Sequence, residues 1–181
     1  LCSAFAEIAP SYYIYGNNEV EAYYLTTLTQ ESLDAQFGFD DNNVGESEKW
    51  YNDFKGKLTI EVPFTYETKM SGICDETRHD NIWYHKTITV NGKLLENNNY
   101  ILHFEGSDYV TKLWVNGQYA GNHRGGYARF SFDITNLLHD GENELTVKVE
   151  DSFDMQQPRG KQRWMDYNFL CFYVQTTGIW K

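Results

Sequence analysis

The sequence predicts an all-β fold, a β-sandwich or jelly roll, and three observations support that prediction. Short runs of alternating apolar and polar residues follow one another after about residue 57, turn-forming residues separate these runs, and no helical stretch lies between them. Many short strands without intervening helices are typical of antiparallel sandwiches and jelly rolls. We expect strands at 58–64, 83–90, 100–105, 110–115, 129–135, 144–150 and 169–175.

The run 144–150 shows the alternation most clearly. Its apolar residues at 145, 147 and 149 alternate with polar residues at 146, 148 and 150. Such a period of two predicts one buried face and one solvated face, as in antiparallel sheets. The dipeptide Asn116-Gly117 follows the run that ends at residue 115, and it accepts positive φ at both central positions of a type I′ hairpin turn.

The first part of the chain has a different character. Residues 1 to about 57 are acidic, polar and irregular, and 19–33 predicts only a short helix, which its threonines weaken. The run 40–45 resembles a calcium-binding loop, but Val44 occupies a ligand position, so we expect a solvated acidic loop. We divide the chain into an N-terminal extension, 1–34, and one domain, 35–181.

Composition excludes several classes of protein. The 181 residues are 41% hydrophobic and 17% aromatic, which is enough to bury a core, and the net charge of −11 argues against binding nucleic acid or an anionic membrane non-specifically. No run of 18 apolar residues occurs, so we expect no membrane span. Ala4-Phe5-Ala6 resembles the end of a signal peptide but lacks the charged and apolar regions before it, so the compartment stays open between cytoplasm and secretion or periplasm.

The sequence predicts neither a metal site nor a cofactor. Cys2, Cys74 and Cys171 are scattered and odd in number, which fits neither a disulfide framework nor a zinc site. None of the five histidines has a metal-ligand spacing. The carboxylates of Glu105, Asp108, Asp133 and Glu142 fall at expected strand ends or turns, and nothing pairs two of them as acid–base catalysis by two carboxyl groups requires.

Several motifs, taken together in this order, resemble the N-terminal sugar-binding domain of family 2 glycoside hydrolases. The resemblance covers about 35–181 and is carried by Val62-Pro63-Phe64, Ile82-Trp83-Tyr84-His85-Lys86, Leu102-His103-Phe104-Glu105-Gly106-Ser107-Asp108-Tyr109, Leu113-Trp114-Val115-Asn116-Gly117, His123-Arg124-Gly125-Gly126-Tyr127, Phe132-Asp133-Ile134-Thr135, Gly141-Glu142-Asn143-Glu144-Leu145, Gln157-Pro158-Arg159-Gly160-Lys161-Gln162 and Thr176-Thr177-Gly178-Ile179-Trp180.

This resemblance implies a galactose-binding-like jelly roll followed in the parent protein by an immunoglobulin-like domain and an (α/β)8 barrel. The barrel of such β-galactosidases and β-glucuronidases carries both catalytic glutamates, so we expect no catalytic residue in this chain. The implied partners are a β-glycoside and the other two domains, and the parent enzyme can form a homo-oligomer. One sodium-dependent β-galactosidase subgroup contributes an Asn and an Asp from this domain, but Glu61 and Phe172 stand at the matching positions and depart from that pattern.

The candidate contact residues fall in two stretches and one isolated position. Arg159, Lys161 and Arg163 form a basic cluster in a loop marked by Pro158 and Gly160, and Trp164 follows at once; aromatic faces stack on sugars, and basic or amide groups bind hydroxyls. The same loop could dock instead on an acidic neighbouring domain. We take as sugar or interdomain contact candidates Arg159, Lys161, Gln162, Trp164, His123, Arg124, Tyr127 and Asp108, with a plain turn as the alternative for 123–127.

Three functions stay open at this point. The chain is an accessory domain that shapes the active site of a larger glycosidase, a free-standing carbohydrate-binding module, or a structural interdomain module. Exposed Trp and Tyr in a flat or grooved cluster would favour the binding module, whereas a large apolar patch on one face would favour either of the others. We expect Trp83, Trp114 and Trp180 to lie in a core or an interface.

Overall fold

The computed structural model describes residues 34–90, 99–154 and 156–181. Within these ranges the regular structure is strands and two short 3₁₀ helices, which confirms the predicted all-β class. The expected helix at 19–33, the tripeptide Ala4-Phe5-Ala6 and Cys2 lie outside the described residues.

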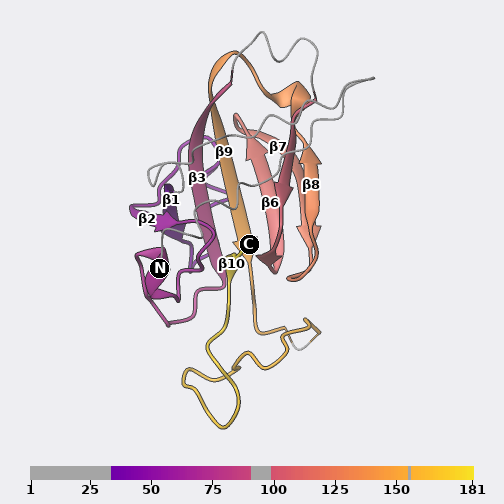
Figure 1. The fold of residues 1–181 in the computed structure, drawn as a ribbon. Coiled ribbons are helices and arrows are strands. Elements are labelled where there is room, and N and C mark those ends of the chain that lie inside the picture. Colours follow the sequence, from indigo (N-terminus) through magenta and orange to yellow (C-terminus); the bar gives the residue numbers. More distant parts are fainter. Residues whose placement is uncertain (1–33, 91–98, 155) are drawn as a thin grey trace, which may run out of the picture.

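The main layer is a six-stranded antiparallel sheet with the order β2-β1-β3-β9-β6-β7 (Figure 1). Its longest pair, β3 with β9, runs in register over all ten residues of each strand. The strands are β1 (Asp34–Phe39), β2 (Leu58–Glu61), β3 (Asn81–Val90), β6 (Val110–Val115), β7 (Gln118–Arg124) and β9 (Gly141–Glu150).

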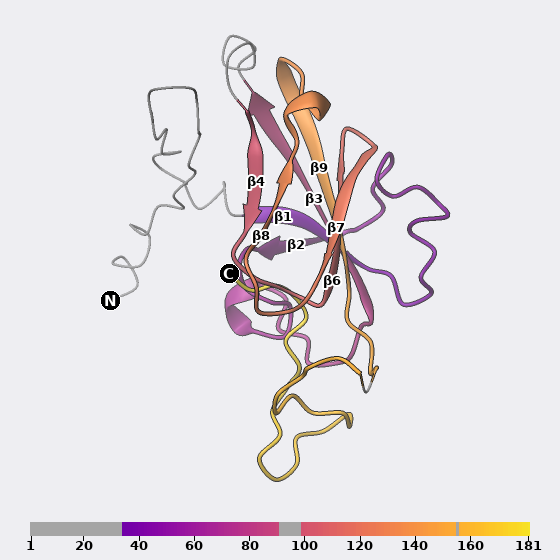
Figure 2. The same cartoon turned by 90° about the vertical axis from the view of Figure 1, so that its right-hand side faces the viewer.

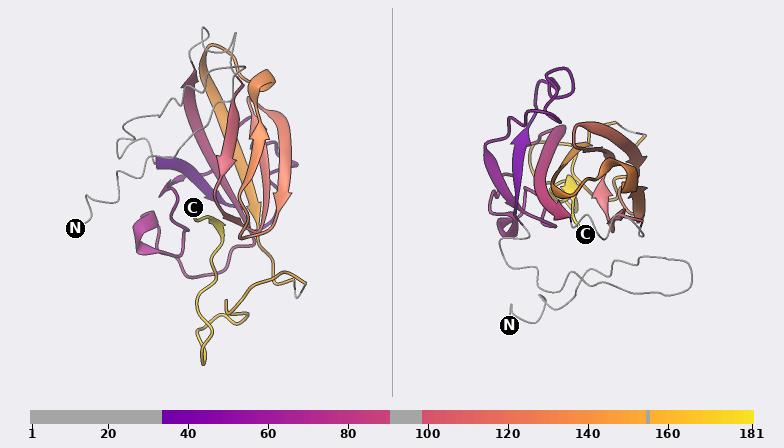
Figure 3. Two further views of the ribbon diagram at one scale, coloured as in Figure 1. Left: turned by 45° about the vertical axis from the view of Figure 1, so that its right-hand side comes forward. Right: turned by 90° about the horizontal axis from the view of Figure 1, so that it is seen from above.

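A smaller layer faces one side of this sheet. It consists of the antiparallel pairs β4 (Ile101–Phe104) with β8 (Phe130–Asp133) and β5 (Ser107–Asp108) with β10 (Gly178–Ile179). The two 3₁₀ helices, η1 (Lys69–Ser71) and η2 (Thr135–Leu137), lie in connections. Figure 2 shows β4 and β8 in front of one face of the main sheet and the 40–57 excursion on the other, and Figure 3 shows the layers from above.

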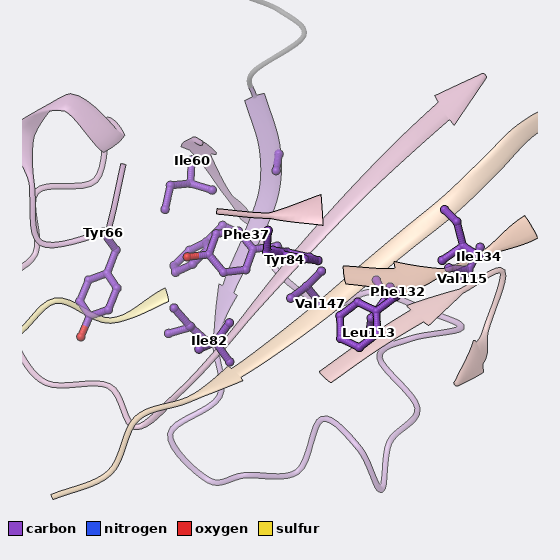
Figure 4. Close-up of a cluster of buried hydrophobic side chains, with 13 residues drawn as sticks. Phe37, Ile60, Tyr66, Ile82, Tyr84, Leu113, Val115, Phe132, Ile134 and Val147 are labelled. Atoms are coloured by element: carbon purple, nitrogen blue, oxygen red, sulfur yellow. The ribbon is translucent and has the colours of Figure 1, made fainter. Parts of the chain in front are cut away.

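The core fills the space between the two layers. Phe37, Ile82, Tyr84, Leu113 and Val147 come from the main sheet and meet residues of β8 and its flanks (Figure 4). Burial of these apolar side chains, each contributing about 1.5–3 kcal/mol, is what holds the layers together. The buried cluster comprises Ala35, Phe37, Ile60, Tyr66, Ile82, Tyr84, Phe104, Leu113, Val115, Phe132, Ile134, Val147 and Val149.

The outer face of the sheet is covered as well, which corrects the prediction of a solvated face for β9. Trp50 from the 40–57 excursion packs with Trp83 and Trp114, which places both of these tryptophans in a core as expected. Lys148 has only 1% of its side chain exposed, and its Nζ lies 2.9 Å from Glu46 Oε1 and 2.8 Å from Glu150 Oε1. Polar side chains alternate along β9 as predicted, but Thr146 and Lys148 are buried, and Lys148 bonds to Asn43 and Glu46 of an excursion remote in sequence.

Asp40 begins this excursion, and it is buried rather than solvated. Its carboxylate accepts hydrogen bonds from the amides of Val44 and Gly45 at 2.8 and 2.9 Å and from the indole nitrogen of Trp83 at 3.0 Å. The run 40–45 is therefore a hydrogen-bonded turn whose first carboxylate already has three donors, and Asp41 is the exposed acidic residue beside it.

The individual strand predictions have mixed outcomes. Positive φ at Asn116 (51°) and Gly117 (75°) confirms the hairpin between β6 and β7. The sequence analysis missed β1 in the stretch taken as irregular, and it missed β7. The expected strand at 169–175 is wrong, because Leu170 adopts a φ of 49° and the segment makes isolated bridges, Phe169 to Phe172 and Tyr173 to Gln162, rather than a strand.

Candidate functional site

The candidate contact residues gather at one end of the sandwich, where the chain leaves β9 and returns to β10. Residues 151–177 make this excursion, which projects beyond the ends of the strands in Figures 1 and 2. It is fixed to the sandwich by buried polar side chains.

Asp108, the last residue of β5, is the first of these. Its Oδ2 accepts a hydrogen bond from the side-chain amide of Gln162 at 3.0 Å, across 54 residues of sequence. Gly126 passes so close that a Cβ there would lie 2.5 Å from Asp108 Oδ1, so this approach requires glycine. Burial, and next the neighbouring carboxylate of Asp151, raise the pKa of Asp108 to about 6.

Gln162 is buried and joins two parts of the loop. While its amide nitrogen donates to Asp108, its Oε1 accepts the amide of Thr176 at 3.1 Å. Both polar atoms are used internally, so Gln162 positions the loop and offers no group to a ligand in this structure.

Arg159 also points inward. One guanidinium nitrogen donates to Asp151 Oδ1 at 2.9 Å and to Gln157 Oε1 at 3.1 Å. The other oxygen of Asp151 accepts the hydroxyl of Thr177 at 2.8 Å, and the amide of Thr177 donates to Glu67 Oε1 at 3.1 Å. A chain of hydrogen bonds thus ties the loop to the connection between β2 and β3.

The predicted basic cluster is not a surface cluster. Arg163 is buried, and its three nitrogens donate to Gln175 Oε1, Asn168 Oδ1 and the carbonyl of Glu76. With Arg159 paired to Asp151, Lys161 is the exposed cation among the three. The sequence carried no periodic signal for these inward orientations, because the acceptors lie in irregular segments and one of them, Glu76, is 87 residues from Arg163.

The motif 123–127 divides between a strand and a turn. His123 and Arg124 end β7, where the ring of His123 stacks on Phe130 at 4.0 Å between centroids and its Nε2 is buried without a hydrogen-bond partner. Arg124 is exposed and reaches Asp154 at 3.9 Å. Tyr127, 60% exposed, follows in the turn. The structure thus brings Arg124 and Tyr127 to the same end as the loop, and it turns His123 inward.

Beyond these ties the loop carries an aromatic knob, which we define as Trp164, Tyr167, Phe169, Leu170 and Phe172. The ring of Trp164 packs edge-on against Phe169 and Phe172 at 4.8 and 4.5 Å between centroids. Trp164 is 46% exposed and Leu170 is 94% exposed. Trp164, one of the contact candidates, is therefore accessible, and its apolar neighbours form a patch around it.

Sequence reasoning missed Glu67, Asp151, Arg78 and Phe153 at this end. The guanidinium of Arg78 lies 3.3 Å from the centre of the Phe153 ring, beside a cleft of about 270 Å³ that Arg163 and Asp166 also line. Trp180, expected in a core or an interface, is partly buried and donates its indole N–H to the Gly126 carbonyl at 2.8 Å. Isolated positions in irregular segments give no periodic signal by which they could have been found.

Two of the carboxylates considered from the sequence have partners within the domain. Glu105 pairs with Arg129 at 2.8 Å, and Asp133 accepts the amide of Thr135 at 3.0 Å. Across 34–90, 99–154 and 156–181 no group of three or more His, Cys, Asp or Glu side chains is arranged to hold a metal ion, and Cys74 and Cys171 are free and exposed. In the same ranges no helix is long and apolar enough to cross a membrane.

Comparison with known families decides the assignment. The model of the glycosyl hydrolases family 2 sugar binding domain matches residues 30–169. The chain belongs to this family. A protein of Formosa agariphila that carries a β-glucuronidase name is 31% identical over 154 residues, which is 84% of this chain and 18% of the relative. A β-galactosidase of Kluyveromyces lactis is 35% identical over 63% of this chain and 10% of its own length.

Solved structures agree with the fold of this family 2 sugar-binding domain. A β-glucuronidase of Lactobacillus rhamnosus superposes with a TM-score of 0.60 at 24% identity, covering 67% of this chain and 20% of that structure. A β-glucuronidase of Bifidobacterium dentium gives 0.57 at 26% identity, over 65% and 19%. The chain thus spans about a fifth or less of the length of each of these proteins.

Proposed function

We propose that this chain is the non-catalytic sugar-binding domain of a longer retaining β-glycosidase of the β-galactosidase or β-glucuronidase type. In that protein the loop 151–177 supports and shapes the active site of a catalytic barrel. The observation that carries this proposal is the construction of the loop, in which buried polar ties at Asp108, Gln162 and Arg159 hold an exposed aromatic knob beyond the ends of the strands.

Internal pairing assigns different roles to the candidates. Arg159 and Gln162 position the loop, because one guanidinium nitrogen of Arg159 bonds to Asp151 and Gln157 and both polar atoms of Gln162 are hydrogen-bonded within the domain. Four candidates are exposed and available to a β-glycoside or to the barrel and the immunoglobulin-like domain: Arg124, Tyr127, Lys161 and Trp164. The rings of the knob pack on one another, with Trp164 edge-on to Phe169 and Phe172 and these two stacked at 4.9 Å between centroids, which favours docking and active-site support over a free-standing binding module.

The test uses the longer enzyme with Trp164→Ala and Arg159→Ala. We expect Trp164→Ala to lower kcat/KM at least tenfold on an aryl β-glycoside, because a support of the active site is removed. Arg159→Ala should lower the stability by about 3–5 kcal/mol, since it leaves the buried Asp151 without its cation.

Arg129→Ala is the matched control, because Arg129 forms an exposed pair with Glu105 and should change both quantities little. Unchanged kcat/KM in Trp164→Ala would make the knob ordinary surface. Tight glycan binding by the 181-residue chain alone would favour the free-standing module instead.

A further inference from the structure

Glu67 is a buried carboxyl group that the proposed function does not use. It lies in the connection between β2 and β3, it is 6% exposed, and its Oε2 is buried without a hydrogen-bond partner. Its Oε1 accepts the amide of Thr177, the residue that precedes β10. Glu67 therefore touches the point at which the loop 151–177 rejoins the sandwich.

The group around Glu67 holds two carboxyl groups, Glu67 and Asp151, and one guanidinium, Arg159. Asp151 shares Thr177 with it, taking the hydroxyl of that residue while Glu67 takes the amide. The single guanidinium in this group, Arg159, is paired with Asp151. An ionised Glu67 would thus be a second buried carboxylate without a cation of its own, which costs several kcal/mol unless the group is protonated.

The other groups near Glu67 are the neutral hydroxyls of Tyr84 and Tyr66, and His79, which packs on the ring of Tyr66. Tyr84 from β3 is uncharged, and its hydroxyl oxygen accepts a hydrogen bond from the amide of Ile179 at 3.2 Å. Tyr66 adjoins Glu67 in sequence, and His79 packs on the Tyr66 ring but pairs with Asp41 and Asp75. The hydroxyl of Thr65 and a backbone amide favour the ionised form, but burial outweighs them and raises the pKa of Glu67 to about 7.

We propose that Glu67 is a proton-controlled latch: protonated, it holds the loop 151–177 and β10 on the end of the sandwich, and ionised, it loosens them. The uncharged carboxyl can stay beside Asp151 in the closed state, and loss of its proton favours an open state in which water reaches both carboxylates. The latch acts on the loop that carries Arg159 and Trp164, and it stands whether or not that loop contacts a sugar.

The sign of the effect follows from the two ionisation states. Below pH 4.5, the ordinary value, Glu67 is protonated whether the loop is closed or open, so closure is most favourable there. The contribution of Glu67 to the free energy of closure falls as the pH rises from 4.5 towards 7, and it is fully lost above pH 7. Between pH 6 and 8 the opening constant of the loop should rise about tenfold.

Hydrogen exchange on the 181-residue chain measures this constant, after correction for the intrinsic pH dependence of exchange. The reporters are the amides of Thr177, Ile179 and Arg163, and the amide of Val147 in β9 reports global unfolding. We expect a tenfold rise at the three reporters and a much smaller one at Val147. In Glu67→Gln, which keeps the shape without the charge, the rise should vanish, whereas the matched control Glu76→Gln, exposed in the same connection, should keep it.

Several results would overturn the latch. The same tenfold rise at Val147 would mean global destabilisation, and an unchanged rise in Glu67→Gln would assign the titration to another group, such as Asp108. If Glu67→Gln does not fold, the carbon-13 resonance of the Glu67 carboxyl is titrated in the unmodified chain. A midpoint below 5.5 in that titration refutes the proposal, and a midpoint near 7 supports it.

Discussion

The carboxyl group of Asp108 is almost fully buried, and it accepts one side-chain hydrogen bond, from the amide of Gln162. Because the pKa of Asp108 is raised to about 6 from 3.8, the unfolded chain releases this proton at lower pH than the folded chain does. The resulting penalty on the folded state is absent below pH 3.8, grows between 3.8 and 6, and is complete above 6. We therefore expect Asp108→Asn to raise the free energy of unfolding by on the order of 1–3 kcal/mol at pH 7.5 and to leave it unchanged at pH 3.5.

Asp133 provides the opposite case within the same molecule. Hydrogen bonds from the hydroxyl and then the amide of Thr135 lower the pKa of Asp133, so its ionised form supports the fold. Urea unfolding at pH 7.5 and pH 3.5 measures both variants, and Asp133→Asn should not raise the free energy of unfolding at either pH. A gain in both variants would trace the effect to net charge, since each substitution removes one negative charge from a chain of −11.

At the scale of elements, the outer face of β9 depends on a group of two lysines and two glutamates. Lys148 and Lys112 both lie within 3.0 Å of Glu46 and Glu150, and Glu46 belongs to the 40–57 excursion. Burial alone would raise the pKa of Glu46, but the two lysines hold it below its usual value. This group fastens the excursion over Trp83 and Trp114.

We expect Lys148→Ala to lower the free energy of unfolding by about 1.5–3 kcal/mol, because it removes charged hydrogen bonds to two carboxylates, which keep Lys112, and opens the contact with the excursion. Lys55→Ala is the control, since Lys55 and Asp53 form an exposed pair in the same excursion and should contribute less than about 1 kcal/mol. Chemical denaturation of the three proteins gives the comparison, and equal losses in the two variants would contradict a fastening role for Lys148.

The same elements show why sequence predicted the sheet better than the site. Alternation along 144–150 and the Asn116-Gly117 turn depend on local sequence, and both are present in the structure. The second buried face of β9 depends on an excursion about 100 residues away, and the inward turn of Arg163 depends on an acceptor at Glu76. Contacts at such separations leave no period in the sequence, so the direction in which each polar side chain points could not be predicted.

At the scale of the whole molecule, the two faces of the main sheet differ in what covers them. The smaller sheets cover one face with apolar side chains, and the 40–57 excursion covers the other, where its Trp50 packs with Trp83 and Trp114 of the sheet and its Glu46 pairs with Lys148. The loop 151–177 is the part that extends beyond both, as Figure 1 shows. Apolar side chains exposed together on such a projection are typical of an interaction surface.

Leu170, the most exposed member of the aromatic knob, provides the decisive comparison between the 181-residue chain and the longer protein. In the chain alone Leu170→Ser should change the free energy of unfolding by less than about 0.5 kcal/mol, because 94% of the residue is already in water. If the knob docks on another domain of the longer protein, the same substitution should weaken that domain contact by about 1–3 kcal/mol, measured by thermal and urea unfolding. Met70→Ser is the matched control, since Met70 is 56% exposed on η1, away from the knob, and should be neutral in both proteins. Neutrality of Leu170→Ser in both would contradict docking and would leave the knob facing solvent or substrate.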